Sequence, residues 1–174
     1  STAYSSTLAV GQQGSGVVAA SALASGDLSI AIGSAAAVGV VASVDNSAGA
    51  GNAGRTAGSA YSKVQAINAS AVPNLTATAD TTAVLDFVAV TDTASAYTLS
   101  INGTGVYTAD GNAISGTQMA AQINANAAAT GVTASFDSGT NRMTLNASDG
   151  RNIDLSQTAS AAAGLAQGLT TTTT

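Results

Sequence analysis

"SGTQMAAQINANAAATGVTASFD", residues 115–137, has a counterpart earlier in the same chain, "SAYSKVQAINASAVPNLTATAD" at residues 59–80. Both stretches begin with Ser, reach an Ile-Asn pair eight residues later and end in an alternating tract. Their starting positions differ by 56 residues (115 − 59). Self-similarity of this kind is the signature of a repeated structural unit. The sequence therefore predicts two copies of one unit.

Each copy is predicted to contain one amphipathic helix. Ser59 and Ser115 are suited to the N-cap position, because a Ser hydroxyl accepts a hydrogen bond from the first free backbone N–H groups of a helix. The apolar residues that follow recur at i, i+3 or i+4 spacing, which places them on one helical face. These residues are Val64 and Ile67 in the first copy, and Met119 and Ile123 in the second.

Alternating tracts rich in Val, Ile, Thr and Tyr flank both helices and predict half-buried antiparallel strands. Asn102-Gly103 is a hairpin turn signal, and residues 137–141 are a second turn candidate. Leu85, Phe87 and Ala89 are expected to face inward. The predicted strands cover residues 27–33, 38–44, 75–80 and 84–90 in the first copy, and 97–103, 105–109, 132–137, 143–147 and 152–156 in the second.

The predicted fold class is therefore α+β: two tandem ββαββ-type units whose antiparallel sheets are each covered by one helix. The domain plan has five parts. The first is a lead-in at residues 1–26, in which residues 5–26 are expected to form an extended strand that pairs with a sheet edge. Within the first unit, residues 45–58 are expected to form a flexible insertion. The remaining parts are the first unit at 27–90, a join at 91–96, the second unit at 97–156 and an Ala/Thr-rich lead-out at 157–174.

The composition excludes several functional classes. The chain has nine Asp, no Glu, only four basic residues and a net charge of −5, so it lacks a basic surface for nucleic acid or anionic membranes. It also has no Cys and no His, which removes the thiol nucleophile, the imidazole base and the common zinc ligands. No apolar run reaches the roughly 20 residues of a transmembrane helix, and no signal peptide is visible. An enzymatic function is not expected.

Three patterns invite a chemical interpretation, and each has a simpler structural one. Asp137, Asp149 and Asp154 lie near predicted turns, where capping is more typical than calcium binding. "GAGNAG" at residues 49–54 fits G-x-G-x-x-G but lacks the parallel βαβ context of a dinucleotide site. Four N-x-[ST] sequons are typical chance matches in a chain this rich in Asn, Ser and Thr: Asn68, Asn74, Asn102 and Asn146.

No catalytic, cofactor-binding or metal-binding residue is predicted from these patterns, and no cofactor. For a binding function, the aromatic residues available to form an exposed cluster include the four tyrosines, which are Tyr4, Tyr61, Tyr97 and Tyr107.

The second copy resembles the repeat of bacterial flagellin outer domains, which also occurs in the filament cap and other hook-associated proteins. The residues that carry the resemblance are Ser100-Ile101-Asn102-Gly103, Gln122 to Ala125, Thr130 to Ser135, Leu145, and Ser148 to Ile153. Residues 22–33 resemble the start of another copy, where flagellins commonly read "GDL.ING", although Ala31-Ile32 departs from that pattern. Together the two copies span residues 22–156.

The resemblance implies a structural, surface-exposed outer domain of the extracellular flagellar filament, exported through the flagellar channel. Such a domain supports motility, filament surface contacts and antigenicity, and it is expected to carry O-linked sugars on Ser or Thr. Its expected partners are other flagellin subunits, reached through inner helical domains outside this chain, and also host surfaces, antibodies or glycans. The alternative is an adhesive or cap-type module of a hook-associated or other appendage protein that binds host surface or glycans.

Overall fold

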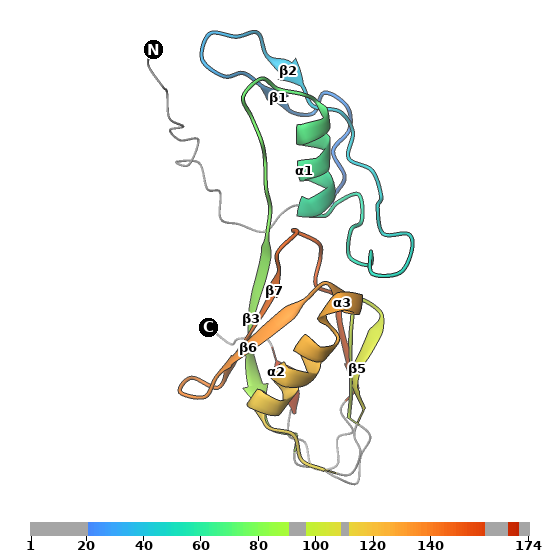
Figure 1. Ribbon diagram of the computed structural model, residues 1–174, viewed down its shortest axis with the longest axis vertical. Coiled ribbons are helices and arrows are strands. Elements are labelled where there is room, and N and C mark those ends of the chain that lie inside the picture. Colours follow the sequence, from blue (N-terminus) through green and yellow to red (C-terminus); the bar gives the residue numbers. More distant parts are fainter. Residues whose placement is uncertain (1–20, 91–96, 109–111, 159–166, 171–174) are drawn as a thin grey trace.

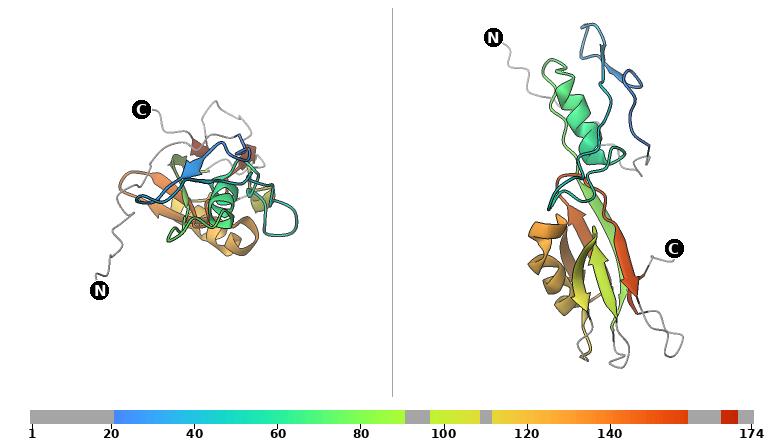
Figure 2. Two further views of the ribbon diagram at one scale, coloured as in Figure 1. Left: turned by 90° about the horizontal axis from the view of Figure 1, so that it is seen from above. Right: turned by 90° about the vertical axis from the view of Figure 1, so that its right-hand side faces the viewer.

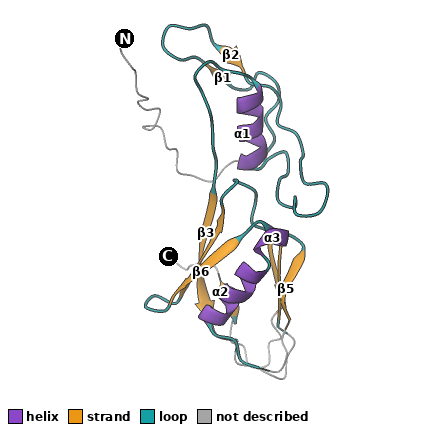
Figure 3. Cartoon of the chain, viewed as in Figure 1, coloured by secondary structure: helices purple, strands orange, loops and turns teal. Residues whose placement is uncertain are grey.

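The computed structural model describes residues 21–90, 97–108, 112–158 and 167–170 (Figure 1). Within them the fold is α+β with antiparallel sheets and few helices (Figure 3), which confirms the predicted class at this level. In chain order the elements are β1 (Ser29–Ile30), β2 (Val38–Gly39), α1 (Ala60–Ala69), β3 (Thr81–Val88), β4 (Thr98–Ile101), β5 (Thr104–Thr108), α2 (Gly116–Ala125), α3 (Ala127–Thr130), β6 (Thr133–Asp137), β7 (Arg142–Ala147), β8 (Leu155–Thr158) and β9 (Gly168–Thr170).

The described residues form two lobes along the long axis of the molecule (Figures 1 and 2). The upper lobe contains β1, β2 and α1, and the lower lobe contains the remaining elements. β3 enters the lower lobe directly from an extended segment that descends beside α1. The two lobes therefore share one continuous stretch of backbone.

The lower lobe holds the main core. One antiparallel sheet has the order β6-β7-β3-β9 and the other has the order β5-β4-β8, while α2 packs on β6 and β5. The apolar side chains of these elements form a single cluster that is almost completely shielded from water. Its members are Phe87, Val90, Tyr97, Leu99, Ile101, Val106, Ile114, Met119, Ala120, Ile123, Val132, Met143, Leu145, Ala147 and Leu169.

The helix and turns of the second copy form as predicted. Ser115 caps α2 in a capping box with Gln118, which satisfies N–H groups at the start of the helix. Met119 and Ile123 are each 0% exposed. At the two predicted turns, Asn102 and Asn141 adopt positive φ angles of 50° and 54°, a conformation that Asn tolerates better than most residues.

The first copy is built differently. Ser59 caps α1 as predicted, but β1 and β2 are only two residues long, and the buried apolar residues of this lobe are Val40, Ala66 and Val72. The prediction of a strand at residues 75–80 is wrong, because this segment has no strand partner within the described residues.

The tandem ββαββ arrangement is not confirmed, because β3 pairs with β7 of the second copy and with β9, which lies in the predicted lead-out. The sequences explain the difference. In the second copy, the hairpin turn after β6 is stabilised by Asp137, which accepts hydrogen bonds from the Gly139 N–H (2.8 Å) and the Thr140 hydroxyl (2.8 Å). After Asp80 the chain instead continues with two β-branched residues, Thr81 and Thr82, which favour an extended strand over a turn.

Smaller differences concern the strand ends. Leu85 and Phe87 pack against the core as predicted, but Ala89 is exposed and the prediction for it is wrong. β3 ends at Val88, and Val90, which is 1% exposed, forms an isolated bridge with Ile114 instead. The predicted lead-in strand lies largely, at residues 5–20, outside the described residues, as does the whole join at 91–96.

Candidate functional site

A polar junction lies where the two lobes meet, and it is built from Arg55, Asp149 and Arg151. Arg55 donates to Oδ2 of Asp149 from Nε (3.0 Å) and Nη2 (2.9 Å). Arg151 donates to the same carboxylate from Nε (3.0 and 3.1 Å) and Nη2 (2.8 Å). One carboxylate therefore joins two guanidinium groups that come from different copies of the repeat.

Arg151 is the most buried member of this junction, with 4% of its surface exposed. Its Nη1 donates to the backbone carbonyls of Gly51 (2.7 Å), Ala53 (3.3 Å) and Thr130 (3.3 Å). A buried charge of this kind is tolerated only when it is paired and hydrogen-bonded, and Arg151 meets both conditions. Gly131 packs directly against the guanidinium, where a Cβ atom would overlap it.

The glycine-rich loop at residues 49–54 binds a cation, the Arg151 guanidinium, whereas a nucleotide phosphate is an anion. Its carbonyl oxygens at Gly51 and Ala53 accept hydrogen bonds from Arg151, whereas a phosphate loop directs N–H groups at an anion. Gly54 has a φ of +85° and lies against the backbone carbonyl of Asn152, so a side chain would not fit there. The G-x-G-x-x-G pattern thus belongs to the junction between the lobes.

Arg55 and Asn102 extend the junction on two sides. Arg55 lies over the ring of Tyr61, with its Cζ atom 4.5 Å from the ring centre, and donates to Oδ1 of Asn52 (2.6 Å). The Asn102 amide donates to the Thr130 carbonyl (2.9 Å) and accepts from the Asp154 N–H (2.9 Å). Asp45–Gly58, which the sequence predicts to be a flexible insertion, therefore includes residues bonded to the second copy.

Burial of the Asp149 carboxyl acts to raise its pKa, but hydrogen bonds from Arg151 and Arg55 outweigh it and lower the pKa to about 2. Because the folded-state pKa lies below the usual value of about 3.9, this carboxylate stabilises the fold above pH 4, and the contribution is lost as the pH falls towards 2.

We expect the free energy of unfolding to decrease between about pH 4 and pH 2. Asp149→Asn removes the ionisable group, so the variant should be less stable at neutral pH and should lose part of the acid dependence. Urea denaturation at several pH values measures both. A slope in this range that is the same in wild type and variant would contradict this role for Asp149.

The other predicted Asp residues do not join Asp149. Asp137 lies in the β6–β7 turn, where hydrogen bonds from Thr140 and Gly139 lower its pKa. Asp154 exchanges two hydrogen bonds with Asn102, one through its N–H and one through its carbonyl. Across the described ranges, no three acidic, His or Cys side chains gather in a way that could hold a metal ion.

Three of the four sequon asparagines use their side-chain amides within the fold. Asn102 donates to Thr130 as described above, Asn146 donates to the hydroxyl of Thr82 (3.0 Å), and Asn68 donates to the carbonyl of Ala77 (3.0 Å). Asn74 is exposed and has a φ of 60°. A sugar on the amide nitrogen of the first three would have to fit beside a hydrogen bond that the fold uses.

Of the tyrosines, Tyr61 lies at the junction, Tyr97 and Tyr107 lie in the lower lobe and Tyr4 falls outside the described residues. The rings of Tyr97 and Tyr107 are 5.9 Å apart. Tyr97 donates to Oε1 of Gln157 (2.9 Å), and burial raises its pKa to about 12. The three described tyrosines therefore do not form one exposed aromatic cluster.

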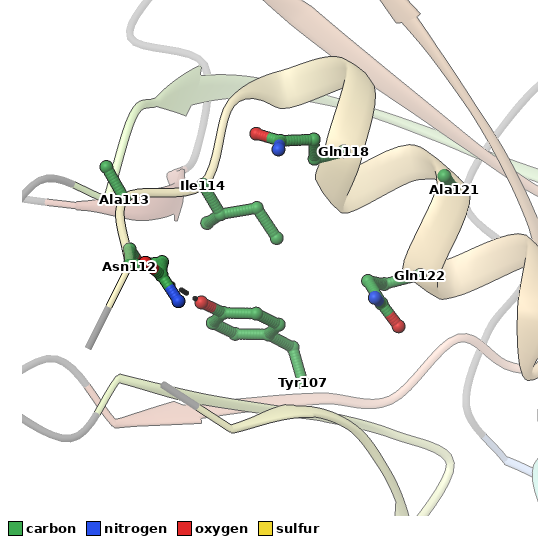
Figure 4. A pocket seen from close by; sticks show the side chains of 7 residues that line it. All are labelled: Tyr107, Asn112, Ala113, Ile114, Gln118, Ala121 and Gln122. Atoms are coloured by element: carbon green, nitrogen blue, oxygen red, sulfur yellow. Dashed lines mark hydrogen bonds between the residues drawn. The ribbon is translucent and has the colours of Figure 1, made fainter. Parts of the chain in front are cut away.

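A hollow of about 340 Å³ lies between β5 and the start of α2 (Figure 4). The Tyr107 hydroxyl there donates to the Asn112 carbonyl (3.4 Å), and Oε1 of Gln118 accepts from the backbone N–H of Ser115. The lining residues carry no ionisable group other than the phenol of Tyr107: Tyr107, Asn112, Ala113, Ile114, Gln118, Ala121 and Gln122. These side chains provide no acid–base pair for catalysis near neutral pH.

The fold and the junction define an α+β domain in which Arg151, the buried charged side chain of the described residues, bonds the two lobes together. Comparison with known protein families places this domain further: residues 98–149 match the family described as the flagellin hook IN motif. The chain therefore carries a motif of flagellin, a family of structural proteins of the bacterial flagellum, as the resemblance predicts. No curated protein and no solved structure gives a significant match.

The matched segment includes the whole of β4 to β7 and ends at Asp149 of the junction. The first copy lies outside the match. In the described ranges, every helix is too short or too polar to span a membrane.

Sequence reasoning noted Arg55 and Arg151 only as parts of the charge balance and missed their pairing with Asp149. The low number of charged residues could have indicated this pairing, because an Arg in a chain with so few charges is expected to have a specific partner. It also missed the bonds made by Asn124 and Gln157, which are described below.

Proposed function

We propose that the chain is a surface-exposed, non-catalytic domain of the bacterial flagellar filament. The observation that carries this proposal is the match of residues 98–149 to the flagellin hook IN motif. In this account the domain thickens and coats the filament, sets its surface contacts and antigenicity, and contributes to motility. Assembly with other subunits uses helices outside this chain, as the resemblance to flagellin implies.

The character of the main sheet supports the proposal. At β6 and β7 its outer face, opposite the core, carries polar side chains, which suits exposure to water. The exposed or half-buried residues on β6 and β7 that form this face are Thr133, Ser135, Asp137, Arg142, Thr144 and Asn146, and β3 exposes Val84 and Val88 beside them. Exposed hydroxyls such as those of Ser135 and Ser138 are the kind of group that O-linked sugars would occupy, and antibodies would bind this face first.

We further propose that residues 97–156 form the principal unit of this domain and that residues 27–90 form an accessory unit that is bound to it by hydrogen bonds and strand pairing. The contacts that support this division are the hydrogen bonds of Arg55, Asp149 and Arg151, together with the pairing of β3 with β7. Residues 1–26 and 157–174 would then lead into and out of the domain.

The test is an in-frame deletion of codons 21–170 from the gene that encodes this chain, in motile cells. Because a coating domain does not build the filament, we expect filaments to assemble with a smaller diameter in electron micrographs. Loss of all filaments in the presence of a complementing control would overturn the proposal. Filaments of unchanged diameter with a lost terminal cap would favour the cap-type alternative.

A further inference from the structure

The Asn of the second Ile-Asn pair bonds both backbone groups of one strand residue. Asn124, at the end of α2, donates from Nδ2 to the Ala134 carbonyl (2.9 Å) and accepts at Oδ1 from the Ala134 N–H (2.8 Å). Its side chain therefore imitates the pair of hydrogen bonds that a neighbouring strand would make.

These bonds lie on the outer edge of the main sheet, where α2 packs on β6. β6 is the terminal strand in the order β6-β7-β3-β9 and pairs only with β7. In an antiparallel ladder, alternate residues direct their N–H and C=O groups towards and away from the partner strand. Since Ala134 bonds Asn124, its neighbours Thr133 and Ser135 face β7, and the Ala134 N–H and C=O point away from β7 towards α2.

The opposite end of the sheet has the same arrangement. β9 is the other terminal strand, and both backbone groups of Leu169 bond the Gln157 side chain: Nε2 donates to the carbonyl (2.6 Å) and Oε1 accepts from the N–H (3.1 Å). Gln157 lies on β8 of the second sheet and Leu169 is 5% exposed, so this carboxamide links the two sheets, whereas Asn124 reaches the β6 edge from a helix.

In the first copy, the Asn of the Ile-Asn pair makes the same two hydrogen bonds, but to a segment that is not part of a sheet. Asn68 donates to the Ala77 carbonyl (3.0 Å) and accepts from the Ala77 N–H (2.8 Å), although residues 75–80 are not part of a strand. The Asn of each Ile-Asn pair therefore makes the same contact in two different surroundings, which indicates that the contact is a property of the pair itself.

We propose that Asn124, which reaches from α2, closes the edge of β6 against a second copy of this chain. Open strand edges are templates for pairing between molecules, and proteins block them in several ways. The segment at this edge, residues 133–137, is suited to self-pairing. In an antiparallel pair centred on Ser135, Asp137 of one copy lies opposite Thr133 of the other, so no like charges oppose each other.

The closure does not depend on the proposed function. In a filament, copies of the chain are held side by side at high effective concentration, so closure of the edge would be more important there. This consequence rests on the proposed function.

Asn124→Ala in the purified full chain tests the proposal. The variant frees the Ala134 N–H and C=O for pairing, so we expect self-association roughly tenfold or more tighter than in wild type. Sedimentation velocity over a range of protein concentrations measures it. Asn126→Ala is the matched control, because the Asn126 side chain donates to the Gln122 carbonyl within the helix and not to a strand edge.

Asn124→Asp should behave differently from Asn124→Ala. Its carboxylate still accepts from the Ala134 N–H but places a negative charge at the edge, so we expect self-association no stronger than in wild type. A folded Asn124→Ala that associates no more than Asn126→Ala would overturn the proposal, as would equal association of the Ala and Asp variants.

Amide hydrogen exchange on the wild-type chain is a test that needs no variant. The Ala134 N–H should exchange about tenfold or more slowly than the Phe136 N–H, which points to the same edge without a carboxamide partner among the described residues. Equal exchange at the two positions would contradict the closure even if Asn124→Ala fails to fold.

Discussion

Arg151→Ala is expected to lower the free energy of unfolding by about 3–5 kcal/mol. The variant leaves the carbonyls of Gly51 and Ala53 without the donor that they have in the wild type and leaves Asp149 with Arg55 as its remaining guanidinium partner. It also opens a space beside Gly131, which packs on the guanidinium. The loss of these hydrogen bonds is costly because the Arg151 side chain is only 4% exposed, so water does not replace it as a donor to the groups that it bonds.

Arg142→Ala is the matched control for this measurement. Arg142 pairs with Asp86 at 3.4 Å, but the two side chains are 50% and 38% exposed. An exposed pair of this kind contributes about 0–1 kcal/mol, so the control should be nearly as stable as wild type. Urea denaturation of both variants decides the question, and equal losses would show that the junction is no more important than a surface ion pair.

Ile123→Ala is the second variant with a large expected effect. Ile123, in the last turn of α2, is 0% exposed and belongs to the core of the lower lobe. Truncation of a buried Ile to Ala typically costs about 2–5 kcal/mol, because apolar burial is lost and a cavity remains. We expect a value in this range from thermal or urea denaturation.

The repeat supplies the control for this prediction. Ile67 occupies the same place in the first copy but is only partly buried, and its lobe has a small core. Ile67→Ala should therefore cost no more than about half as much as Ile123→Ala. A larger effect at Ile67 would mean that the first copy, and not the second, holds the stable core.

Much of the second copy could be predicted from its sequence because local signals and tertiary contacts agree there. The Ser115 cap, the apolar spacing of Met119 and Ile123, and the Asn102-Gly103 turn each specify local structure, and the core confirms them. In the first copy, Ser59 gives the same local signal and α1 forms, but helix formation does not decide how the following strands pair.

The pairing of β3 could not be predicted from the repeat, because the two copies differ just after their aligned Asp residues. Asp137 is followed by a turn, whereas Asp80 is followed by Thr81 and Thr82, which begin β3 and pair with β7 of the second copy. The junction was missed for a related reason. Arg55 and Asp149 are 94 residues apart in sequence, and no local pattern indicates a contact over that separation.

The position of this domain on the cell tests the central proposal most directly. Antibodies raised against the purified chain should label flagella by immunogold electron microscopy along the whole filament, and they should do so on intact cells. Labelling confined to the filament tip, the hook or the cell body, with the filament shaft unlabelled, would contradict a filament surface domain.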